Sequence, residues 1–145
     1  MKVRKERQEK MRHIVRKERI RTQHELVQAL GEEGYPCTQA TVSRDVEELK
    51  LSKSSDGYYV LAEDQHLKRM VHDLADGIKR AGNLVLIHAQ GGTAPGVAGA
   101  IDLAQIDGVV GTVSGDTTVL VVCETEETAT VLEEKIRAFA GETKL

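Results

Sequence analysis

The dipeptide Asp56-Gly57 constrains the fold of this chain most, because it is a strong signal for a two-residue β-hairpin turn. The residues on its two sides, 51–54 and 58–61, are predicted to form short strands. Three short amphipathic helical patterns precede this hairpin, between residues 10 and 49. Three helices followed by a hairpin predict a winged helix-turn-helix domain over residues 1–62, mainly α-helical with a β-hairpin wing.

Two threonines indicate where the second and third helices begin. Thr22 is followed by Glu25 three residues later, which matches a capping box, and Thr38 is placed to cap the third helix. Gly31 is expected to end the second helix. The apolar residues at helical spacing are Met11, Ile14 and Val15 in the first helix, Leu26, Val27 and Leu30 in the second, and Val42, Val46 and Leu49 in the third.

The side of the third helix opposite its apolar residues is small and polar around one long cation, Arg44. Such a face can enter the major groove of DNA, where Arg44 and Gln39 can reach base edges or phosphates and Ser43 can bond a phosphate. Lys53 in the wing can contact the backbone. The face comprises Ala40, Ser43, Arg44 and Glu47 with Gln39 at its margin, and the predicted DNA-contacting residues are Gln39, Thr41, Ser43, Arg44 and Lys53.

The charges are divided unevenly along the chain. Residues 1–60 carry 13 Lys and Arg against 10 Asp and Glu, a net of +3, whereas residues 61–145 carry 7 against 13, a net of −6. A basic arm before an acidic remainder indicates that one end meets a polyanion, although a solvated helix face gives the same pattern. Duplex DNA is favoured over single-stranded RNA, because the module offers only three tyrosines and neither Phe nor Trp for stacking. A protein-binding module is the structural alternative.

A second domain is predicted over residues 67–145, after a short polar linker at 63–66 where the charge balance changes. Its expected elements are a helix from Leu67 to near Gly82, a strand at 84–89, a helix capped by Thr93, strands at 109–113 and 118–123, and a helix at 128–140. In this order they predict a two-layer α+β arrangement.

Two features of the second domain can bind a ligand. The glycine-rich loop 91–96 precedes a helix, whose N-terminal N–H groups favour an anion such as a ligand carboxylate. Asp116 in a hairpin tip and Asp102 near the end of the preceding helix can bind the guanidinium and ammonium groups of a basic ligand. The simpler alternative is a tight turn in the first case and an Asp-containing turn in the second.

Other classes of function find little support in the sequence. The loop 91–96 matches neither a dinucleotide-binding nor a Walker motif, and no nucleophile–base pair is evident, so no enzyme, cofactor or catalytic residue is predicted. The two cysteines, Cys37 and Cys123, make neither a disulfide framework nor a metal cluster, which suits a reducing cytoplasm. No signal peptide and no membrane span are predicted. The sequence indicates no catalytic partner for any of the histidines, which are His13, His24, His66, His72 and His88.

The run Thr38–Asp45, followed by Glu48 and Leu49, resembles the recognition-helix signature of bacterial arginine repressors. Gln23, the pair at 25–26 and the tyrosines of the hairpin fit the same N-terminal pattern. The resemblance implies an arginine-responsive DNA-binding regulator of arginine biosynthesis or catabolism genes. It also implies that Ser43 and Arg44 are central to operator binding, with Gln39 beside them.

The resemblance continues through the second domain, where segments at 92–94, 98, 101–102 and 111–118 are similar to the family's ligand and oligomerisation motifs in the same order. It implies a trimer-forming domain, two trimers stacked into a hexamer, and L-arginine as the effector between them. Asp102 would face the α-amino group of arginine, and Asp116 would reach the guanidinium across the trimer–trimer interface. The effector-binding residues implied are Thr93, Asp102, Ser114, Asp116 and Thr117.

Thr117 departs from the pattern of the family, which has two adjacent acids at positions 116 and 117 of this chain. Losing one carboxylate removes part of the attraction for a cation, on the order of 1 kcal/mol in a partly buried site. Arginine binding is therefore expected to be weaker, or the effector to differ. A regulator of the same fold with another ligand, or with none, is the alternative, and a protein-binding adaptor is a third possibility.

Overall fold

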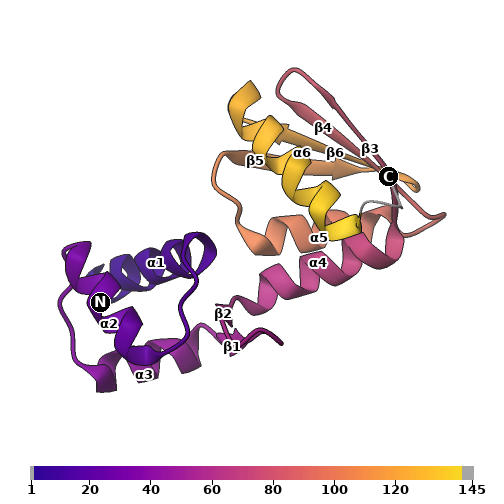
Figure 1. The fold of residues 1–145 in the computed structure, drawn as a ribbon. Helices are drawn as coiled ribbons and strands as arrows, with labels where there is room; N and C mark the ends of the chain where they lie inside the picture. The colour runs from indigo at the N-terminus through magenta and orange to yellow at the C-terminus, as the bar shows by residue number, and fades with distance from the viewer. Residues whose placement is uncertain (1, 142–145) are drawn as a thin grey trace. The chain divides into compact units, whose positions relative to one another are not determined.

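The computed structural model describes residues 2–141, which form two compact units, and the chain passes from the first to the second between Ala62 and Glu63. Figure 1 shows the helices and strands of both units. The first contains the helices α1 (Lys2–Lys17), α2 (Gln23–Glu32) and α3 (Gln39–Glu48) and the strands β1 (Ser52–Lys53) and β2 (Tyr59–Val60). The second contains α4 (Ala62–Leu74), β3 (Ala75–Ala81), β4 (Leu84–Ala89), α5 (Ala94–Ala104), β5 (Val109–Ser114), β6 (Thr118–Cys123) and α6 (Glu126–Ala140).

The first unit has the predicted winged helix-turn-helix arrangement. Both threonine caps are confirmed, since the hydroxyl of Thr22 accepts from the Glu25 N–H at 3.1 Å and that of Thr38 from the Thr41 N–H at 3.2 Å. The returning bond of the predicted capping box differs, because the Glu25 carboxylate accepts from the Arg21 N–H and not from the Thr22 N–H. The wing is shorter than predicted, with two residues in each strand and Gly57 in the turn at a φ of +86°. Its core is formed by Met11, Ile14, Val15, Ile20, Leu26, Leu30, Val42, Tyr59 and Leu61.

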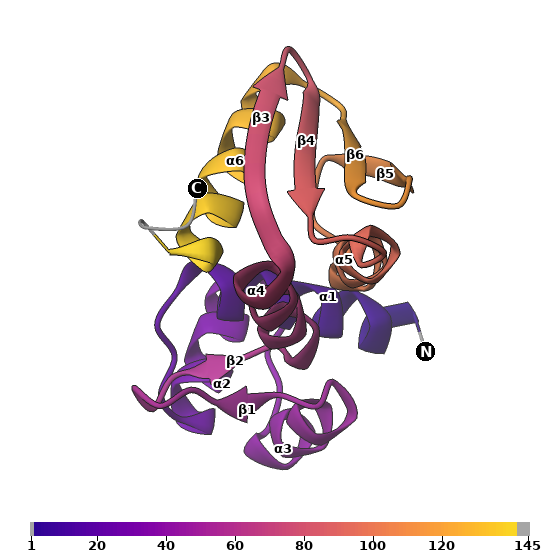
Figure 2. The same ribbon diagram turned by 90° about the vertical axis from the view of Figure 1, so that its right-hand side faces the viewer.

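The second unit is an antiparallel sheet with the strand order β3-β4-β6-β5, covered on one face by α5 and α6 (Figure 2). Period-two alternation places Val85 and Ile87 of β4, with Val119 and Val121 of β6, on the covered face. All four are fully buried against the helices. The predicted two-layer α+β class is confirmed.

The expected helix from Leu67 to Gly82 is wrong in its second half. The α-helix α4 ends at Leu74, and the strand β3 follows directly and pairs with β4. Ile78 caused the wrong prediction, because it lies four residues after Leu74 and so continues the helical spacing of apolar residues. In the structure Ile78 is buried, but it belongs to the strand β3. The pairing of Ala81 with Leu84 makes a hairpin whose turn contains Gly82 at a φ of +60°.

The segment 63–66, predicted as a linker, lies in the first turns of α4, which begins at Ala62. Glu63 and Asp64 favour this start, because carboxylates stabilise the positive end of a helix dipole. The polar composition of the segment therefore marks a helix N-terminus. No helix among residues 2–141 combines the length and the apolar character needed to span a bilayer.

The second face of the sheet is apolar and only partly buried within one chain. Leu86 pairs with Leu120 and Leu84 with Val122, and all four alternate with residues of the covered face. At the edge strand β5, Val113 keeps 67% of its surface exposed and Val110 keeps 66%. The second unit therefore carries an apolar face that its own helices leave uncovered.

Candidate DNA interface and ligand pocket

Four of the five predicted DNA-contacting residues lie on α3, and the fifth, Lys53, lies in the wing. Gln39, Ser43 and Arg44 are all exposed, whereas Val42 is fully buried on the opposite side. Thr41 is half-buried near the helix start, where its hydroxyl accepts from the Thr38 hydroxyl at 3.1 Å. The sequence pattern thus placed the two sides of this helix correctly, because the apolar residues alone define its orientation.

Asp45 is a buried charged residue on α3, and the helical pattern did not predict its burial. Its side chain is 2% exposed and accepts from Arg7 Nε at 2.5 Å and Arg7 Nη2 at 3.1 Å. Gln8 adds a bond to Asp45 at 3.0 Å and another to Glu48 at 2.7 Å. Arg4 forms an ion pair with Glu48. The N-terminal half of α1 therefore holds α3 through paired, hydrogen-bonded charges.

The electrostatics of Asp45 follow from this arrangement. Burial alone raises the pKa of the Asp45 carboxyl, but the hydrogen bonds from Arg7 and Gln8 and the charge of Arg7 outweigh it. The net pKa of Asp45 lies below its ordinary value, so the carboxylate is charged wherever the protein is folded near neutral pH. Among the described residues, no buried side-chain nitrogen or oxygen lacks a hydrogen-bond partner.

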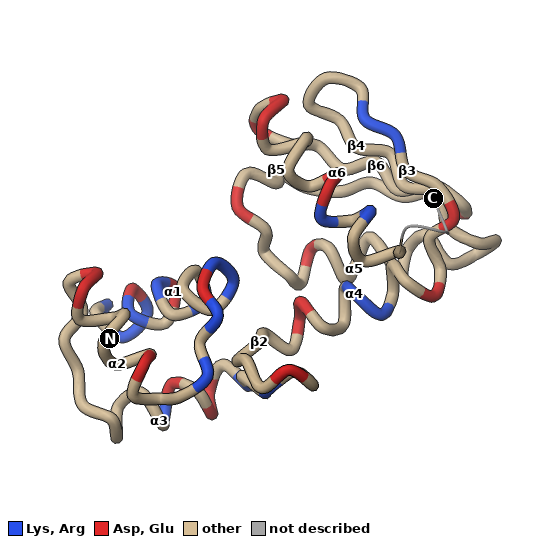
Figure 3. The backbone as a smooth tube through the Cα atoms, viewed as in Figure 1, with Lys and Arg blue, Asp and Glu red and all other residues tan. Residues whose placement is uncertain are grey.

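The wing places a further cation beside α3. Lys53 of β1 is exposed, and its ammonium lies 5.3 Å from the centre of the Tyr59 ring. Lys and Arg also gather along α1 and its connection to α2 (Figure 3). The first unit therefore carries cations on α1, on the connection to α2, on α3 and in the wing.

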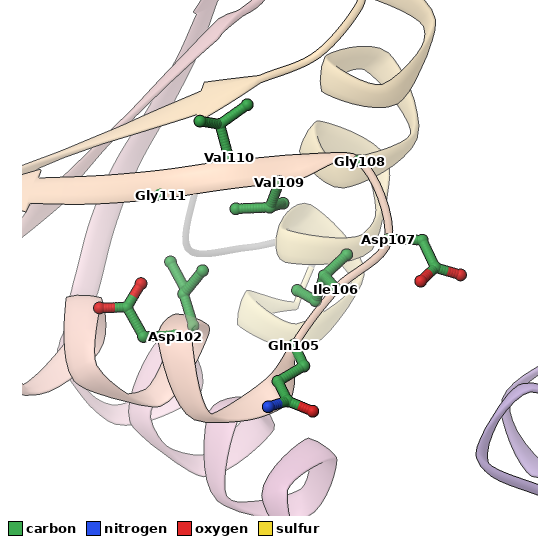
Figure 4. A pocket seen from close by; sticks show the side chains of 9 residues that line it. Asp102, Gln105, Ile106, Asp107, Gly108, Val109, Val110 and Gly111 are labelled. Atoms are coloured by element: carbon green, nitrogen blue, oxygen red, sulfur yellow. The ribbon is translucent and has the colours of Figure 1, made fainter. Parts of the chain in front are cut away.

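Asp102 lines a hollow of about 370 Å³ where the end of α5 meets the start of β5. The Thr112 hydroxyl donates to both carboxylate oxygens of Asp102, at 3.0 and 3.1 Å, and so fixes the carboxylate against β5. Gln105 and Asp107 also line the hollow, and the Asp107 side chain points away from Asp102 (Figure 4). Oxygen acceptors beside an open hollow can bind a cationic group.

Asp116 lies at the opposite end of β5 from this hollow, in the exposed turn between β5 and β6. Its carbonyl accepts from the Ala94 N–H at 3.3 Å, and the Thr117 carbonyl accepts from the Ala89 N–H at 2.8 Å. The structure thus brings the hairpin tip to the loop before α5. Within residues 2–141 of one chain, no hydrogen bond joins Asp116 to Asp102.

Thr93 does not cap α5 as the sequence predicted. Its hydroxyl donates backwards to the Gln90 carbonyl at 2.6 Å, and no side-chain bond reaches the helix N–H groups. The first helical N–H, that of Ala94, is already bonded to Asp116. The start of α5 therefore holds the hairpin tip, which leaves fewer donors for an anion than the sequence suggested.

Ser114, on the covered side of β5, is half-buried opposite Val119.

Two family models match the chain in series. The model described as "Arginine repressor, DNA binding domain" covers residues 2–67, and that described as "Arginine repressor, C-terminal domain" covers residues 71–138. The chain belongs to the arginine repressor family. It is accordingly a DNA-binding transcriptional repressor and not an enzyme, with the first matched domain spanning α1–α3 and the wing.

Relatives within the arginine repressor family are similar over nearly the whole chain. A protein of Thermus thermophilus named arginine repressor is 41% identical in an alignment of 147 residues that covers 94% of this chain and 88% of the relative. An arginine repressor of Symbiobacterium thermophilum is 41% identical over 143 residues, covering 92% and 95%. One of Shouchella clausii is 40% identical over 136 residues, covering 87% and 91%.

Proposed function

We propose that this repressor works in the cytoplasm as a hexamer, a dimer of trimers, that binds operator DNA in response to L-arginine. It would thereby control genes of arginine biosynthesis or catabolism. The observation that supports DNA binding is the exposed face of α3 that carries Ser43 and Arg44. The observation that supports the ligand side is Asp102, an oriented carboxylate at an open hollow.

In this proposal, α3 enters the major groove of the operator. Gln39 and Arg44 then contact base edges or phosphates, while Ser43 and Thr41 bond the backbone and Lys53 contacts it from the wing. The bonds from Arg7 to Asp45 support this role, because a helix held by buried charge pairs keeps its orientation when it meets the duplex. Several such domains on one oligomer bind repeated half-sites.

Self-association is supported by the uncovered face of the sheet. Large apolar side chains on the edge strand β5 of this face remain exposed in one chain, namely Val110 at 66% and Val113 at 67%. Exposed apolar patches of this kind mark interfaces, and an edge strand such as β5 needs covering against uncontrolled pairing. A second and third copy of the chain are the occupants we propose for this surface.

L-Arginine is the effector we propose, bound between trimers by Asp102 of one chain and Asp116 of another, with Thr93, Ser114 and Thr117 nearby. The net charge of −6 over residues 61–145 concentrates carboxylates that repel when chains associate. The two cationic groups of bound arginine, its guanidinium and its α-ammonium, would replace this repulsion with paired charges. Arginine therefore stabilises the assembled, DNA-competent form by its differential affinity for it.

The test combines fluorescence anisotropy on a control-region duplex of arginine genes with light scattering, each with and without L-arginine. We expect arginine to tighten DNA binding and to increase the mean mass, and Asp102→Asn and Asp116→Asn to abolish both effects. Glu134→Gln is the matched control, because Glu134 is an exposed acid of the same domain on α6 and does not line the hollow beside Asp102. DNA binding that ignores arginine up to millimolar concentration would contradict the effector assignment.

A repressor of the same fold with a different effector, or with none, is the second candidate. Thr117 favours it, because this chain has a neutral hydroxyl where the resemblance led us to expect a second acid. A thermal-shift panel of amino acids separates the candidates, because a ligand that binds only the folded form raises the melting temperature. A shift with another amino acid and none with arginine would select this alternative.

A further inference from the structure

Two guanidinium groups converge on one tyrosine beside the turn of the wing. Arg21 Nη2 donates to the Tyr58 hydroxyl at 2.9 Å, and Arg21 Cζ lies 4.3 Å from the centre of the Tyr58 ring. Arg19 Cζ lies 5.4 Å from the same centre. Both arginines come from the connection between α1 and α2, whereas Tyr58 directly precedes β2. We call these three residues the Tyr58 cluster.

The backbone holds the Tyr58 cluster in place. Ile20, which lies between the two arginines, is 6% exposed, and its carbonyl accepts from the Tyr59 N–H at 2.8 Å. The connection from α1 to α2 is therefore fixed to the wing next to Tyr58. Gly57 also fits closely, since a Cβ at that position would lie 3.3 Å from Arg21 Nη1. The backbone bond at Ile20 and the close packing at Gly57 therefore keep the two guanidinium groups near each other.

The two guanidiniums lack the counter-charges that several cations of α1 have. Arg7, Arg4 and Lys10 form ion pairs with Asp45, Glu48 and Glu33. Within the described part of the chain, no ion pair joins Arg19 or Arg21 to a carboxylate. Glu25, the nearby acid, accepts from the backbone N–H of Arg21 at 3.0 Å and not from its guanidinium. Two adjacent cations without an anion repel each other.

The local field of the Tyr58 cluster favours a negatively charged oxygen. Hydrogen bonding from Arg19 and then from Arg21 lowers the pKa of the Tyr58 phenol below its ordinary value. The same two cations that stabilise a phenolate can stabilise the oxygen of an anionic ligand. Guanidinium groups match phosphate oxygens in geometry, and DNA-binding proteins contact phosphates most often through Arg and Lys.

We propose that Arg19 and Arg21, held by Tyr58, form a binding site for a backbone phosphate of duplex DNA beside the wing. This inference rests on the proposed operator binding and adds to it a site that the predicted contacts on α3 and Lys53 do not include. A phosphate contact positions the protein along the duplex and carries no sequence information of its own. It therefore fixes where the α3 face meets the groove.

The test measures the affinity of the full chain for a control-region duplex and for a random duplex over a range of salt concentrations. Each lost phosphate contact reduces the slope of log affinity against log salt by about 0.9. We expect Arg19→Gln and Arg21→Gln to reduce the slope by about this amount for both duplexes and to weaken binding to both. Tyr58→Phe, which removes only the hydroxyl that orients Arg21, is expected to have a smaller effect in the same direction.

The matched control is Arg80→Gln, which removes an arginine of the second unit whose guanidinium already pairs with Glu126 and Glu133. It should leave the salt slope unchanged, and circular dichroism should show that every variant is folded. If the wild type binds and both arginine variants keep its slope, the phosphate site is overturned while operator binding stands. If the variants weaken only the control-region duplex, the arginines read bases and the phosphate assignment is overturned. A wild type that binds no duplex overturns both proposals.

Discussion

Arg7 on α1 donates two hydrogen bonds to Asp45 on α3, at 2.5 and 3.1 Å, although 38 positions separate them in sequence. Asp45 is almost fully buried and Arg7 keeps 15% of its side chain exposed. The contact joins the helix that carries many of the basic residues to the helix that faces the DNA. Its loss is therefore expected to affect both stability and binding.

Asp45→Asn is expected to destabilise the protein by about 3 kcal/mol, because removing one partner of a buried pair leaves the other charge uncompensated. Urea unfolding followed by circular dichroism measures the change. Glu48→Gln is the matched control on the same helix. Glu48 pairs with Arg4 at the surface, where its side chain is 40% exposed, so its loss should cost less than about 1 kcal/mol. Equal effects of the two substitutions would contradict the special role of Asp45.

The contribution of Asp45 should depend on pH in a defined direction. Its folded pKa lies below the unfolded value of 3.8, so the stabilisation is fully present above about pH 4 and is lost as pH falls through the folded pKa. The stability difference between the wild type and Asp45→Asn should therefore shrink between pH 5 and strongly acidic solution. Unfolding curves of both proteins across this range measure it. A difference that stays constant would show that the carboxylate is not the stabilising group.

The features that sequence predicted correctly are those that neighbouring residues determine. The caps at Thr22 and Thr38 and the turn at Gly57 depend on residues at most a few positions apart. The exposed side of α3 also followed from local spacing. The strand β3 was missed because Ile78 fits a helical and an alternating pattern equally well, and only pairing with β4 decides between them.

The contacts that define the sites could not be predicted, because they join distant parts of the chain. Arg7 with Asp45 and Arg21 with Tyr58 are 38 and 37 residues apart, and one sequence carries no sign of such pairing. Thr112 with Asp102 is separated by only ten residues, yet it depends on how α5 packs against β5. Residue types suggested DNA and ligand contacts, whereas the positioning bonds required the fold.

Thr38→Ala is expected to destabilise the protein by about 1 kcal/mol and to weaken DNA binding. The substitution removes the oxygen that accepts from the Thr41 N–H, so the first turn of α3, which carries Gln39, frays more often. Thermal unfolding and anisotropy on the control-region duplex measure the two effects. Thr38→Ser keeps the capping oxygen and should retain most of both. If Ser and Ala behave alike, the cap does not support the DNA-binding helix.

Gly108→Ala is expected to destabilise the second unit by about 2–4 kcal/mol. Gly108 has a φ of +81°, and an added Cβ would lie 2.5 Å from Thr128 Cγ2 on α6. Thr128 cannot move freely, because its N–H donates to the Thr125 hydroxyl that caps α6.

Two further glycines separate the causes of the Gly108 effect. Gly82→Ala tests backbone strain alone, at a φ of +60° with open space around it, and should cost about 1–2 kcal/mol. Gly99→Ala, in the middle of α5 with no atom within 4 Å, should stabilise by about 0.5–1 kcal/mol. Urea unfolding of the three variants gives the comparison. A cost at Gly108 no larger than that at Gly82 would exclude the contact with Thr128 as a cause.

Thr112→Val is expected to weaken L-arginine binding about fivefold, provided that Asp102 binds the ligand as proposed. The Thr112 hydroxyl donates to both Asp102 oxygens, and Val has a similar shape without a donor. The carboxylate then loses its fixed orientation, and a hydrogen bond contributes about 1 kcal/mol. Isothermal titration calorimetry measures the change, with Thr112→Ser as the variant that keeps the hydroxyl. Val leaves the Asp102 charge in place, so an unchanged affinity would mean that this charge suffices without its orientation. An equal loss in Thr112→Ser would instead indicate altered packing.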